Sequence, residues 1–275
     1  MNRKSGTGNR ESGIGNRELV ETEDGTFTAR SSLFDECYHS TRDGALKESL
    51  KKHVEPAFAL IGKRETGNGK RESGIGKREL TILDICFGLG YNTLATLYYL
   101  DFEGLDIPVH IHSPEFDEAL VRSLVDFPYP EAFAPYRNVI ESVAEKGWYE
   151  SGRIRIDVVF GDAREFLKRS DAVFDIVYQD AFSPKKNPLL WTKEYFADLA
   201  RHLAAEAVVT TYSSATPVRM GMVENGLYVY EPPAEGVRSG TIASPSSDLP
   251  LKPIDMALKK MRNPSAAPLY DKDFK

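Results

Sequence analysis

Short apolar runs alternate with helical patterns along most of the chain. The runs at 81–86, 109–112, 154–160 and 173–178 are rich in β-branched and other apolar residues, as buried parallel strands are. After the first run, apolar residues at helical spacing predict a helix that Asn92 or Thr93 would cap. Strands that alternate with helices in this way predict an α/β fold with a parallel sheet.

Weaker patterns complete the expected elements. A short strand is expected at 26–30, followed by a helix from Gly44 to about Leu60 with Asp43 as its cap. Residues 117–150 are expected to be helical, with interruptions at their prolines. The remaining pattern predicts strands at 207–212, 227–231 and 240–244, and helices at 191–203, 217–224 and 254–261.

A glycine turn, Phe87-Gly88-Leu89-Gly90, follows the first buried strand and precedes its helix. Such a turn brings backbone N–H groups to the carboxyl edge of the sheet, where a nucleotide can bind. A pyrophosphate is less well suited, because Asn92 and Leu94 stand where further glycines would be expected. Asp84, inside the strand, favours the nucleoside arrangement used for S-adenosylmethionine. The alternative is a tight strand-to-helix turn without a ligand.

Acidic residues also follow the later strands. Glu115 could accept hydrogen bonds from both ribose hydroxyls of a nucleoside, or could simply favour a helix N-terminus. Asp162 and Ala163 open a helix after the third buried strand and could face an adenine edge. Asp180 begins a proline-stiffened loop after the fourth, where an α/β enzyme places its chemistry.

Composition narrows the class of protein. A chain of 275 residues, 41% of them hydrophobic, is expected to form one globular α/β domain with additions. The net charge of −6 argues against a broad polyanion-binding surface. Cys37 and Cys86 lie far apart, so neither a disulfide framework nor a metal site is expected. The chain has no apolar run of membrane-spanning length and a polar N-terminus, so a cytoplasmic protein is expected.

Two tracts, 5–19 and 66–80, are near copies built on a glycine-containing heptapeptide. We interpret them as flexible insertions, because glycine and the lack of an apolar seam exclude a coiled coil. Basic residues in these tracts could alternatively contact nucleic acid. The expected organisation is a flexible N-terminus at 1–25, an N-terminal strand and helix lid at 26–61, an insertion at 62–79, a nucleotide domain at 80–244 and a C-terminal extension at 245–275.

Several of these segments together resemble the methyltransferase domain of the bacterial tRNA 5-methylaminomethyl-2-thiouridine biosynthesis proteins. The matching segments are Phe34–Tyr38, Asp84–Asn92, Glu115, Gly161–Asp162, Asp180–Pro188 with Trp191–Thr192, and Thr211–Ala215 with Val218–Arg219. The resemblance implies a class I S-adenosylmethionine-dependent methyltransferase with a Rossmann-like, seven-stranded, mostly parallel sheet and helices on both faces. The stand-alone form is expected, because the chain is short and lacks a flavin-binding fingerprint.

The resemblance also implies a reaction and its cofactor. The reaction is N-methylation of the 5-aminomethyl group of (2-thio)uridine at the tRNA wobble position, with S-adenosylmethionine as methyl donor. The implied cofactor-binding residues are Asp84, Phe87, Gly88, Gly90, Asn92, Glu115, Asp162 and Ala163. One departure is Cys86, which stands where the family usually has the first glycine of its turn. The expected partners are the anticodon loop of tRNA and, as separate proteins, an oxidase or upstream tRNA-modifying enzymes.

The loop after Asp180 supplies the expected substrate site. Asp180 is expected to orient the acceptor amine first and to act as a general base second; the alternative is a structural carboxylate. Phe182, Pro184 and Trp191 are expected to wall the uracil ring. Other expected substrate contacts are Tyr38, Asn187 and Tyr212, with Lys185, Lys186 and Arg219 as phosphate contacts or plain surface charges. His39 is expected to be a hydrogen-bonding partner in the pocket wall rather than a base.

Two other functions remain open at this point. A spermidine-synthase-like protein shares the nucleoside fold and would transfer an aminopropyl group to a small polyamine. The Asn187-Pro188-x-x-Trp191 segment argues against it. A catalytically inactive RNA-binding or assembly module is the other alternative, suggested by Cys86 and the two insertions.

Overall fold

The computed structural model describes residues 14, 17–65, 78–233, 236–237 and 239–274. The flexible tracts predicted at 5–19 and 66–80 lie mostly outside these described residues.

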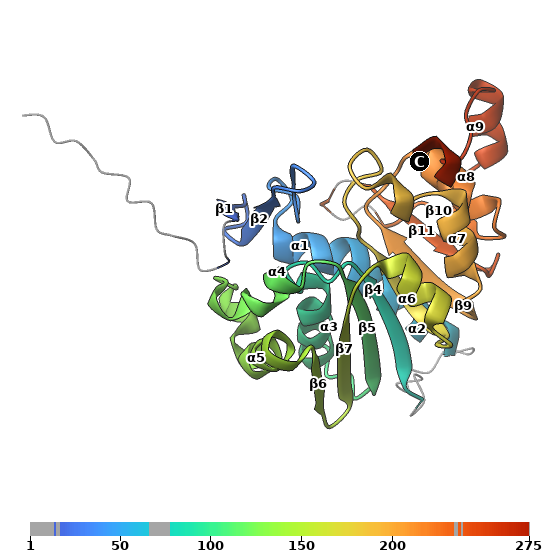
Figure 1. The fold of residues 1–275 in the computed structure, drawn as a ribbon. Helices are drawn as coiled ribbons and strands as arrows, with labels where there is room; N and C mark the ends of the chain where they lie inside the picture. Colours follow the sequence, from blue (N-terminus) through green and yellow to red (C-terminus); the bar gives the residue numbers. More distant parts are fainter. Residues whose placement is uncertain (1–13, 15–16, 66–77, 234–235, 238, 275) are drawn as a thin grey trace, which may run out of the picture.

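A mixed sheet with the strand order β10-β11-β9-β8-β4-β5-β7-β6 forms the centre of the molecule (Figure 1). Its parallel centre consists of β4 (Leu80–Ile85), β5 (Val109–Glu115), β7 (Ile154–Phe160), β8 (Phe174–Gln179) and β9 (Leu203–Thr211). Antiparallel strands flank it, with β11 (Thr241–Ser244) and β10 (Tyr228–Tyr230) beyond β9 and β6 (Trp148–Ser151) beyond β7. The predicted α/β, Rossmann-like fold is confirmed.

The eight-stranded sheet has one strand more than expected, because β6 lies in a region predicted to be helical. Gly147, with a φ of +82°, ends helix α5 (Arg137–Lys146) in a left-handed conformation. Gly152, with a φ of +57°, then turns the chain so that β6 pairs with β7. Two glycines therefore convert the end of a helical region into a hairpin.

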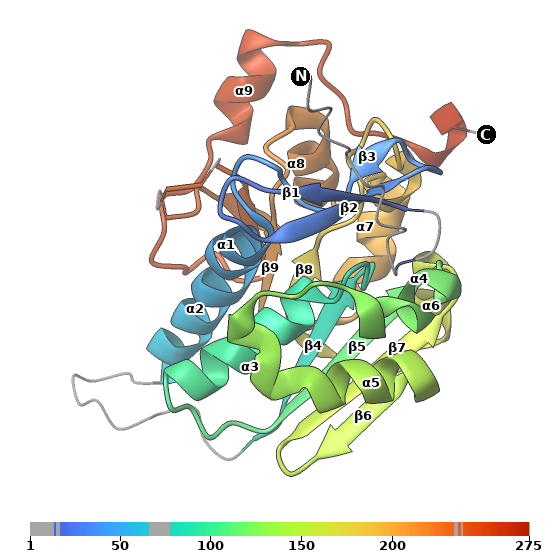
Figure 2. The same ribbon diagram turned by 90° about the vertical axis from the view of Figure 1, so that its left-hand side faces the viewer.

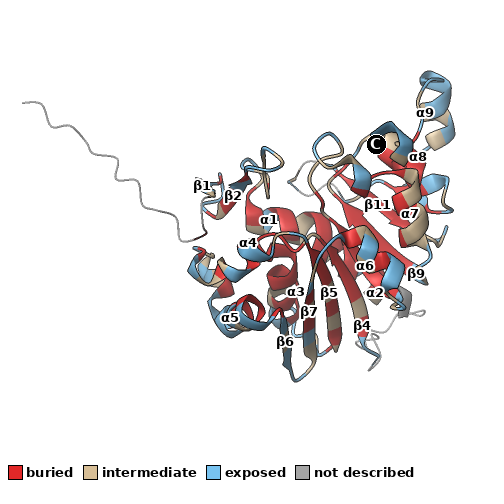
Figure 3. Cartoon of the chain, viewed as in Figure 1, coloured by how far each residue is buried: buried red, intermediate tan, exposed pale blue. Residues whose placement is uncertain are grey.

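Helices cover both faces of the sheet (Figures 1 and 2). On one face lie α2 (Glu55–Glu65), α3 (Tyr91–Phe102) and α5, whose apolar side chains join one core cluster. On the other lie α6 (Ala163–Arg169), α7 (Lys193–Ala200) and α8 (Thr216–Val223), which form a second cluster. Buried residues accordingly concentrate on the strands and on the inner sides of these helices (Figure 3). The segment between α3 and α5 also contains α4 (Glu118–Arg122), η2 (Leu124–Asp126) and η3 (Glu131–Tyr136).

The N-terminal segment packs over the carboxyl edge of the sheet. It begins with a small antiparallel sheet of β1 (Glu18–Glu21), β2 (Phe27–Ser31) and β3 (Glu36–Cys37), of which only β2 was predicted. A continuous helix follows, made of α1 (Ala45–Glu48), the π-helical turn η1 (Ser49–Val54) and α2. It ends at Glu65 rather than near Leu60.

Two predicted helix caps are wrong. Gly44, not Asp43, is the N-cap of α1, and the Asp43 carboxylate instead accepts a hydrogen bond from Lys52 Nζ at 3.0 Å. Gly90 is the N-cap of α3, because the side chains of Asn92 and Thr93 are turned toward Asp84.

The remaining elements lie after β8. The helix predicted at 191–203 is shorter, because Thr192 caps α7 and β9 already begins at Leu203. It is preceded by η4 (Pro188–Leu190). The C-terminal extension contains α9 (Met256–Arg262), which stands away from the body of the molecule, and η5 (Asp271–Phe274) (Figure 2). Among the described residues, no helix has the length and apolar character needed to cross a membrane.

Candidate active site at the carboxyl edge of the sheet

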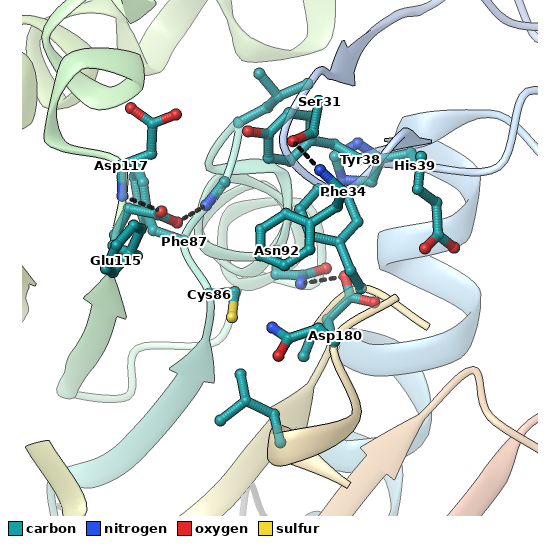
Figure 4. A pocket seen from close by; sticks show the side chains of 18 of the residues that line it. Ser31, Phe34, Tyr38, His39, Cys86, Phe87, Asn92, Glu115, Asp117 and Asp180 are labelled. Carbon is teal, nitrogen blue, oxygen red and sulfur yellow. Dashed lines mark hydrogen bonds between the residues drawn. The ribbon is translucent and has the colours of Figure 1, made fainter. Parts of the chain in front are cut away.

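A pocket of about 960 Å³ lies between the carboxyl ends of the central strands and the N-terminal segment (Figure 4). This volume is at the upper end of the range for small-molecule sites. The N-terminal segment lines one side, and the turns after β4, β5, β7 and β8 line the other. The pocket thus joins the loops that the sequence singled out.

Three alternate positions of the glycine turn after β4 have left-handed backbone conformations. Cys86, Gly88 and Gly90 have φ values of +67°, +55° and +74°. A Cβ on Gly90 would lie 2.9 Å from the Phe87 ring, and a Cβ on Gly88 would lie 3.0 Å from Tyr38. Glycine is therefore required at both positions, while Cys86 adopts a conformation that disfavours a side chain. Cys86 lines the pocket and does not fill it.

Glu115 connects the end of β5 to this turn. Its Oε2 accepts the backbone N–H of Gly88 at 2.7 Å, and its Oε1 accepts that of Asp117 at 2.7 Å. Burial raises the pKa of the Glu115 carboxyl, against the opposing effect of these backbone hydrogen bonds. The carboxylate that these N–H groups hold lines the pocket.

Asp162 and Ala163 line the pocket after β7. The Asp162 side chain caps α6, with Oδ1 accepting the N–H groups of Arg164 at 2.8 Å and Glu165 at 3.0 Å. A helix N-terminus and a carboxylate thus meet at this side of the pocket.

Asp84 does not line the pocket. Its buried carboxylate accepts hydrogen bonds from Asn92 Nδ2 at 3.3 Å and Thr93 Oγ1 at 2.9 Å. Burial raises the pKa of Asp84 to about 7, although both hydrogen bonds oppose the shift. Asp84, which was expected to bind the cofactor, therefore organises the first turn of α3 and does not line the pocket itself.

Asp180, at the start of the loop after β8, lines the pocket. Its Oδ2 accepts Asn92 Nδ2 at 2.9 Å, and its Oδ1 lies 3.4 Å from Nε2 of His53 (Figure 4 shows the Asn92 bond). Burial alone would raise the pKa of Asp180, but His53, His39 and the Asn92 amide outweigh it and hold this pKa below its ordinary value. The pocket therefore contains an ionised carboxylate.

The sequence did not single out His53. It lies on the π-helical turn η1, is completely buried, and also contacts Thr210 Oγ1 through Nδ1 at 3.0 Å. The available signal was its place three residues after Leu50 on the apolar face of the predicted helix. Its partners come from distant strands, so sequence spacing could not identify them.

Aromatic rings form the wall next to Asp180. Phe182 stacks on Phe34 with ring centroids 4.6 Å apart and lies 5.0 Å from the ring of Tyr38. Tyr212 also lines the pocket, and its hydroxyl donates to the Ala181 carbonyl oxygen at 2.8 Å. His39 lines the pocket as well, and burial lowers its pKa.

Some predicted contact residues lie elsewhere. Trp191 is completely buried outside the pocket, where its Nε1–H donates to the Phe182 carbonyl oxygen at 2.7 Å, so it supports the loop instead of walling a base. Arg219 is buried and donates to Gly240 O at 2.9 Å, so it is not placed to contact a phosphate. Asn187 lines the pocket, whereas Pro184 and Lys186 do not, and Lys186 pairs with Asp35 at 3.2 Å.

One group of metal-ligating side chains occurs among the described residues, although the sequence suggested none. His110, His112 and Asp157 have ligand atoms within 4.8 Å of one another. They lie outside the pocket, and Asp157 already pairs with His110 at 2.6 Å and Arg155 at 3.2 Å. We assign this group no role in the site.

Comparisons with known proteins agree with this arrangement. A family model for S-adenosyl-L-methionine-dependent methyltransferases matches residues 133–246. The tRNA 5-methylaminomethyl-2-thiouridine biosynthesis bifunctional protein of Azoarcus sp. (strain BH72) is 33% identical over 233 residues, which are 79% of this chain and 34% of that protein. The chain spans between 34% and 57% of the length of the first curated relatives that it matches.

Two solved structures match a larger share of this chain. Spermidine synthase from Thermotoga maritima has a TM-score of 0.50 at 14% identity, over 93% of this chain and 78% of that one, which shows a shared fold only. The crystal structure of MNMC2 from Aquifex aeolicus has a TM-score of 0.75 at 32% identity, over 97% of this chain and 81% of that one. The chain therefore belongs to the same family as MNMC2 and is an S-adenosyl-L-methionine-dependent methyltransferase.

Proposed function

We propose that this protein transfers a methyl group from S-adenosylmethionine to the primary amine of 5-aminomethyl-(2-thio)uridine at the tRNA wobble position. The product would be 5-methylaminomethyl-(2-thio)uridine. The observation that carries the proposal is the position of the Asp180 carboxylate, which lines the same pocket as the glycine turn and Glu115. The names of the matched relatives support tRNA as the substrate.

The residues after β4, β5 and β7 suit the cofactor. S-adenosylmethionine supplies a methyl group activated by its positively charged sulfur. We assign its ribose hydroxyls to the Glu115 carboxylate and its adenine edge to Asp162 and Ala163. Gly88 lines the pocket without a side chain, which would permit close approach of the nucleoside to the backbone of the turn.

Asp180 would act on the acceptor amine. An alkylammonium with a pKa near 10 must lose a proton before its nitrogen has a free lone pair. The Asp180 carboxylate would accept an N–H bond from the amine, aim the lone pair and stabilise the positive charge that develops on nitrogen. As the nitrogen bonds to the methyl carbon, the carbon–sulfur bond breaks and its electron pair stays on sulfur, and the reaction releases one proton.

The aromatic wall suits a base taken out of its stack. Phe34, Tyr38 and Phe182 supply ring faces beside Asp180, and anticodon loops expose unpaired bases that stack on such rings. A tRNA substrate implies a cytoplasmic protein. Separate tRNA-modifying enzymes would supply the aminomethyl group.

The test is methyl transfer by the purified protein to tRNA that carries 5-aminomethyl-(2-thio)uridine. Nucleoside mass spectrometry should detect the methylated wobble nucleoside when S-adenosylmethionine is present. Transfer of an aminopropyl group from decarboxylated S-adenosylmethionine to putrescine would instead support the spermidine-synthase-like alternative. Tight binding of S-adenosylmethionine without turnover of tRNA or polyamine would indicate an inactive RNA-binding or assembly module.

A further inference from the structure

His53 is a buried imidazole in contact with the carboxylate to which we assign amine orientation. It is fully buried, and its Nε2 lies 3.4 Å from Asp180 Oδ1. The second carboxylate oxygen is held by Asn92 Nδ2 at 2.9 Å. The carboxylate is therefore hydrogen-bonded from α3 at one oxygen, while the other oxygen faces His53 Nε2 on η1 without a hydrogen bond.

The hydrogen-bonding pattern around His53 favours a proton on Nε2. Thr210 Oγ1 lies 3.0 Å from His53 Nδ1 and 3.4 Å from the Val177 carbonyl oxygen. If the threonine hydroxyl donates to Nδ1, the neutral ring must carry its proton on Nε2. With its proton there, His53 Nε2 faces Asp180 Oδ1 at 3.4 Å, a close contact that lacks the geometry of a hydrogen bond.

We propose that His53 is a positioning residue that restrains the Asp180 side chain from η1 and aims its carboxylate at the acceptor amine. The inference rests on the proposed methyl transfer, because Asp180 needs an amine to orient. Without His53, the Asp180 carboxylate would keep the Asn92 hydrogen bond at Oδ2, and Oδ1 would lose its imidazole contact on the η1 side. A buried carboxyl with fewer donors also protonates more readily.

The test compares two substitutions of His53, each of which keeps one of its two polar contacts and removes the other. His53→Asn can keep an acceptor for the Thr210 hydroxyl and leaves Asp180 Oδ1 without its partner. His53→Gln can place an amide donor near the position of Nε2 and so preserve part of the contact. His202→Gln is the control, since His202 bonds the Ala172 carbonyl oxygen at 3.1 Å and does not line the pocket.

The His53 substitutions should change the kcat of methyl transfer to tRNA. We expect His53→Asn to lower kcat by about ten- to a hundredfold, with the Kd for S-adenosylmethionine and the KM for tRNA near wild type. His53→Gln should fall between this variant and wild type, and His202→Gln should match wild type. Equal kcat values in all four proteins would overturn the proposal.

A direct titration separates this proposal from the proposed function. Asp84, His39, Tyr178 and Tyr212 also surround the pair, so a pH–rate profile alone would mix several titrations. Carboxyl ¹³C NMR of Asp180 in the free protein should give a higher pKa in both His53 variants than in wild type. An unchanged pKa would overturn the pairing even if methyl transfer occurs. A raised pKa without methyl transfer would uphold the pairing and reject the proposed function.

Discussion

Cys86 occupies a backbone position that glycine would satisfy better. Its φ of +67° puts a side chain in the left-handed region, at a cost of about 1 kcal/mol or more. Burial raises the pKa of its thiol well above the ordinary value, so the thiol stays neutral and is a poor nucleophile. The residue carries strain without contributing chemistry.

We therefore expect Cys86→Gly to raise the free energy of unfolding by about 1 kcal/mol, because the strain is removed. Urea denaturation measures this change. Cys86→Ala is the matched control, since it keeps a Cβ in the strained position and should give no gain. Equal stabilisation by glycine and alanine would show that the thiol, and not the backbone, is responsible.

Asp84 should make stability depend on pH. Its folded-state pKa of about 7 lies above the ordinary value of 3.8, so the folded state binds the proton more tightly than the unfolded state. Its contribution is fully present below about pH 4 and is lost as the pH rises toward 7, by up to about 1.4 kcal/mol per pH unit. In Asp84→Asn, the free energy of unfolding should fall less between pH 5 and pH 8 than in wild type. Parallel pH curves for the two proteins would contradict the raised pKa.

At the scale of elements, the loop from Asp180 to Trp191 depends on the N-terminal segment. Phe34 stacks on Phe182, and Glu36 Oε2 accepts hydrogen bonds from Ser183 N at 3.1 Å and Ser183 Oγ at 2.9 Å. The ring that we assign to the uracil is thus held by residues far away in the sequence. The N-terminal segment completes the side of the pocket that we assign to the substrate.

Removing that support should weaken tRNA use selectively. Glu36→Ala deletes the acceptor for two hydrogen bonds, each worth about 1.5 kcal/mol or more when the acceptor is charged. We expect kcat/KM for tRNA to fall by about tenfold or more, with the Kd for S-adenosylmethionine unchanged. Glu21→Ala, at an exposed position of β1, should leave both values near wild type. A matching loss in S-adenosylmethionine binding would mean that Glu36 supports the whole pocket.

Local sequence patterns were sufficient to predict the strands and the turns that follow them. Apolar runs predicted β4, β7 and β8 nearly to the residue, and the glycine turn, Glu115 and Asp180 all reach the pocket. Features that depend on distant packing were missed. Trp191 has the aromatic ring that a base-stacking residue needs, but the fold buries it completely behind the loop. His53 has no polar partner nearby in sequence, because Asp180 and Thr210 belong to other elements.

At the scale of the whole molecule, the sheet brings four separate turns to one edge and the N-terminal segment covers them (Figures 1 and 4). The turns after β4, β5 and β7 have the features of a nucleoside site, and the turn after β8 carries the carboxylate. This division places the proposed methyl donor and the proposed acceptor in one pocket. The central claim is that Asp180 acts where they meet.

The most direct measurement is nucleoside mass spectrometry of tRNA bearing 5-aminomethyl-(2-thio)uridine after incubation with S-adenosylmethionine and either wild type or Asp180→Asn. The account predicts a methylated wobble nucleoside with wild type and a rate lower by about a hundredfold or more with the variant, while the Kd for S-adenosylmethionine stays close to wild type. Equal rates for the two proteins, or no methylated wobble nucleoside with wild type, would contradict it.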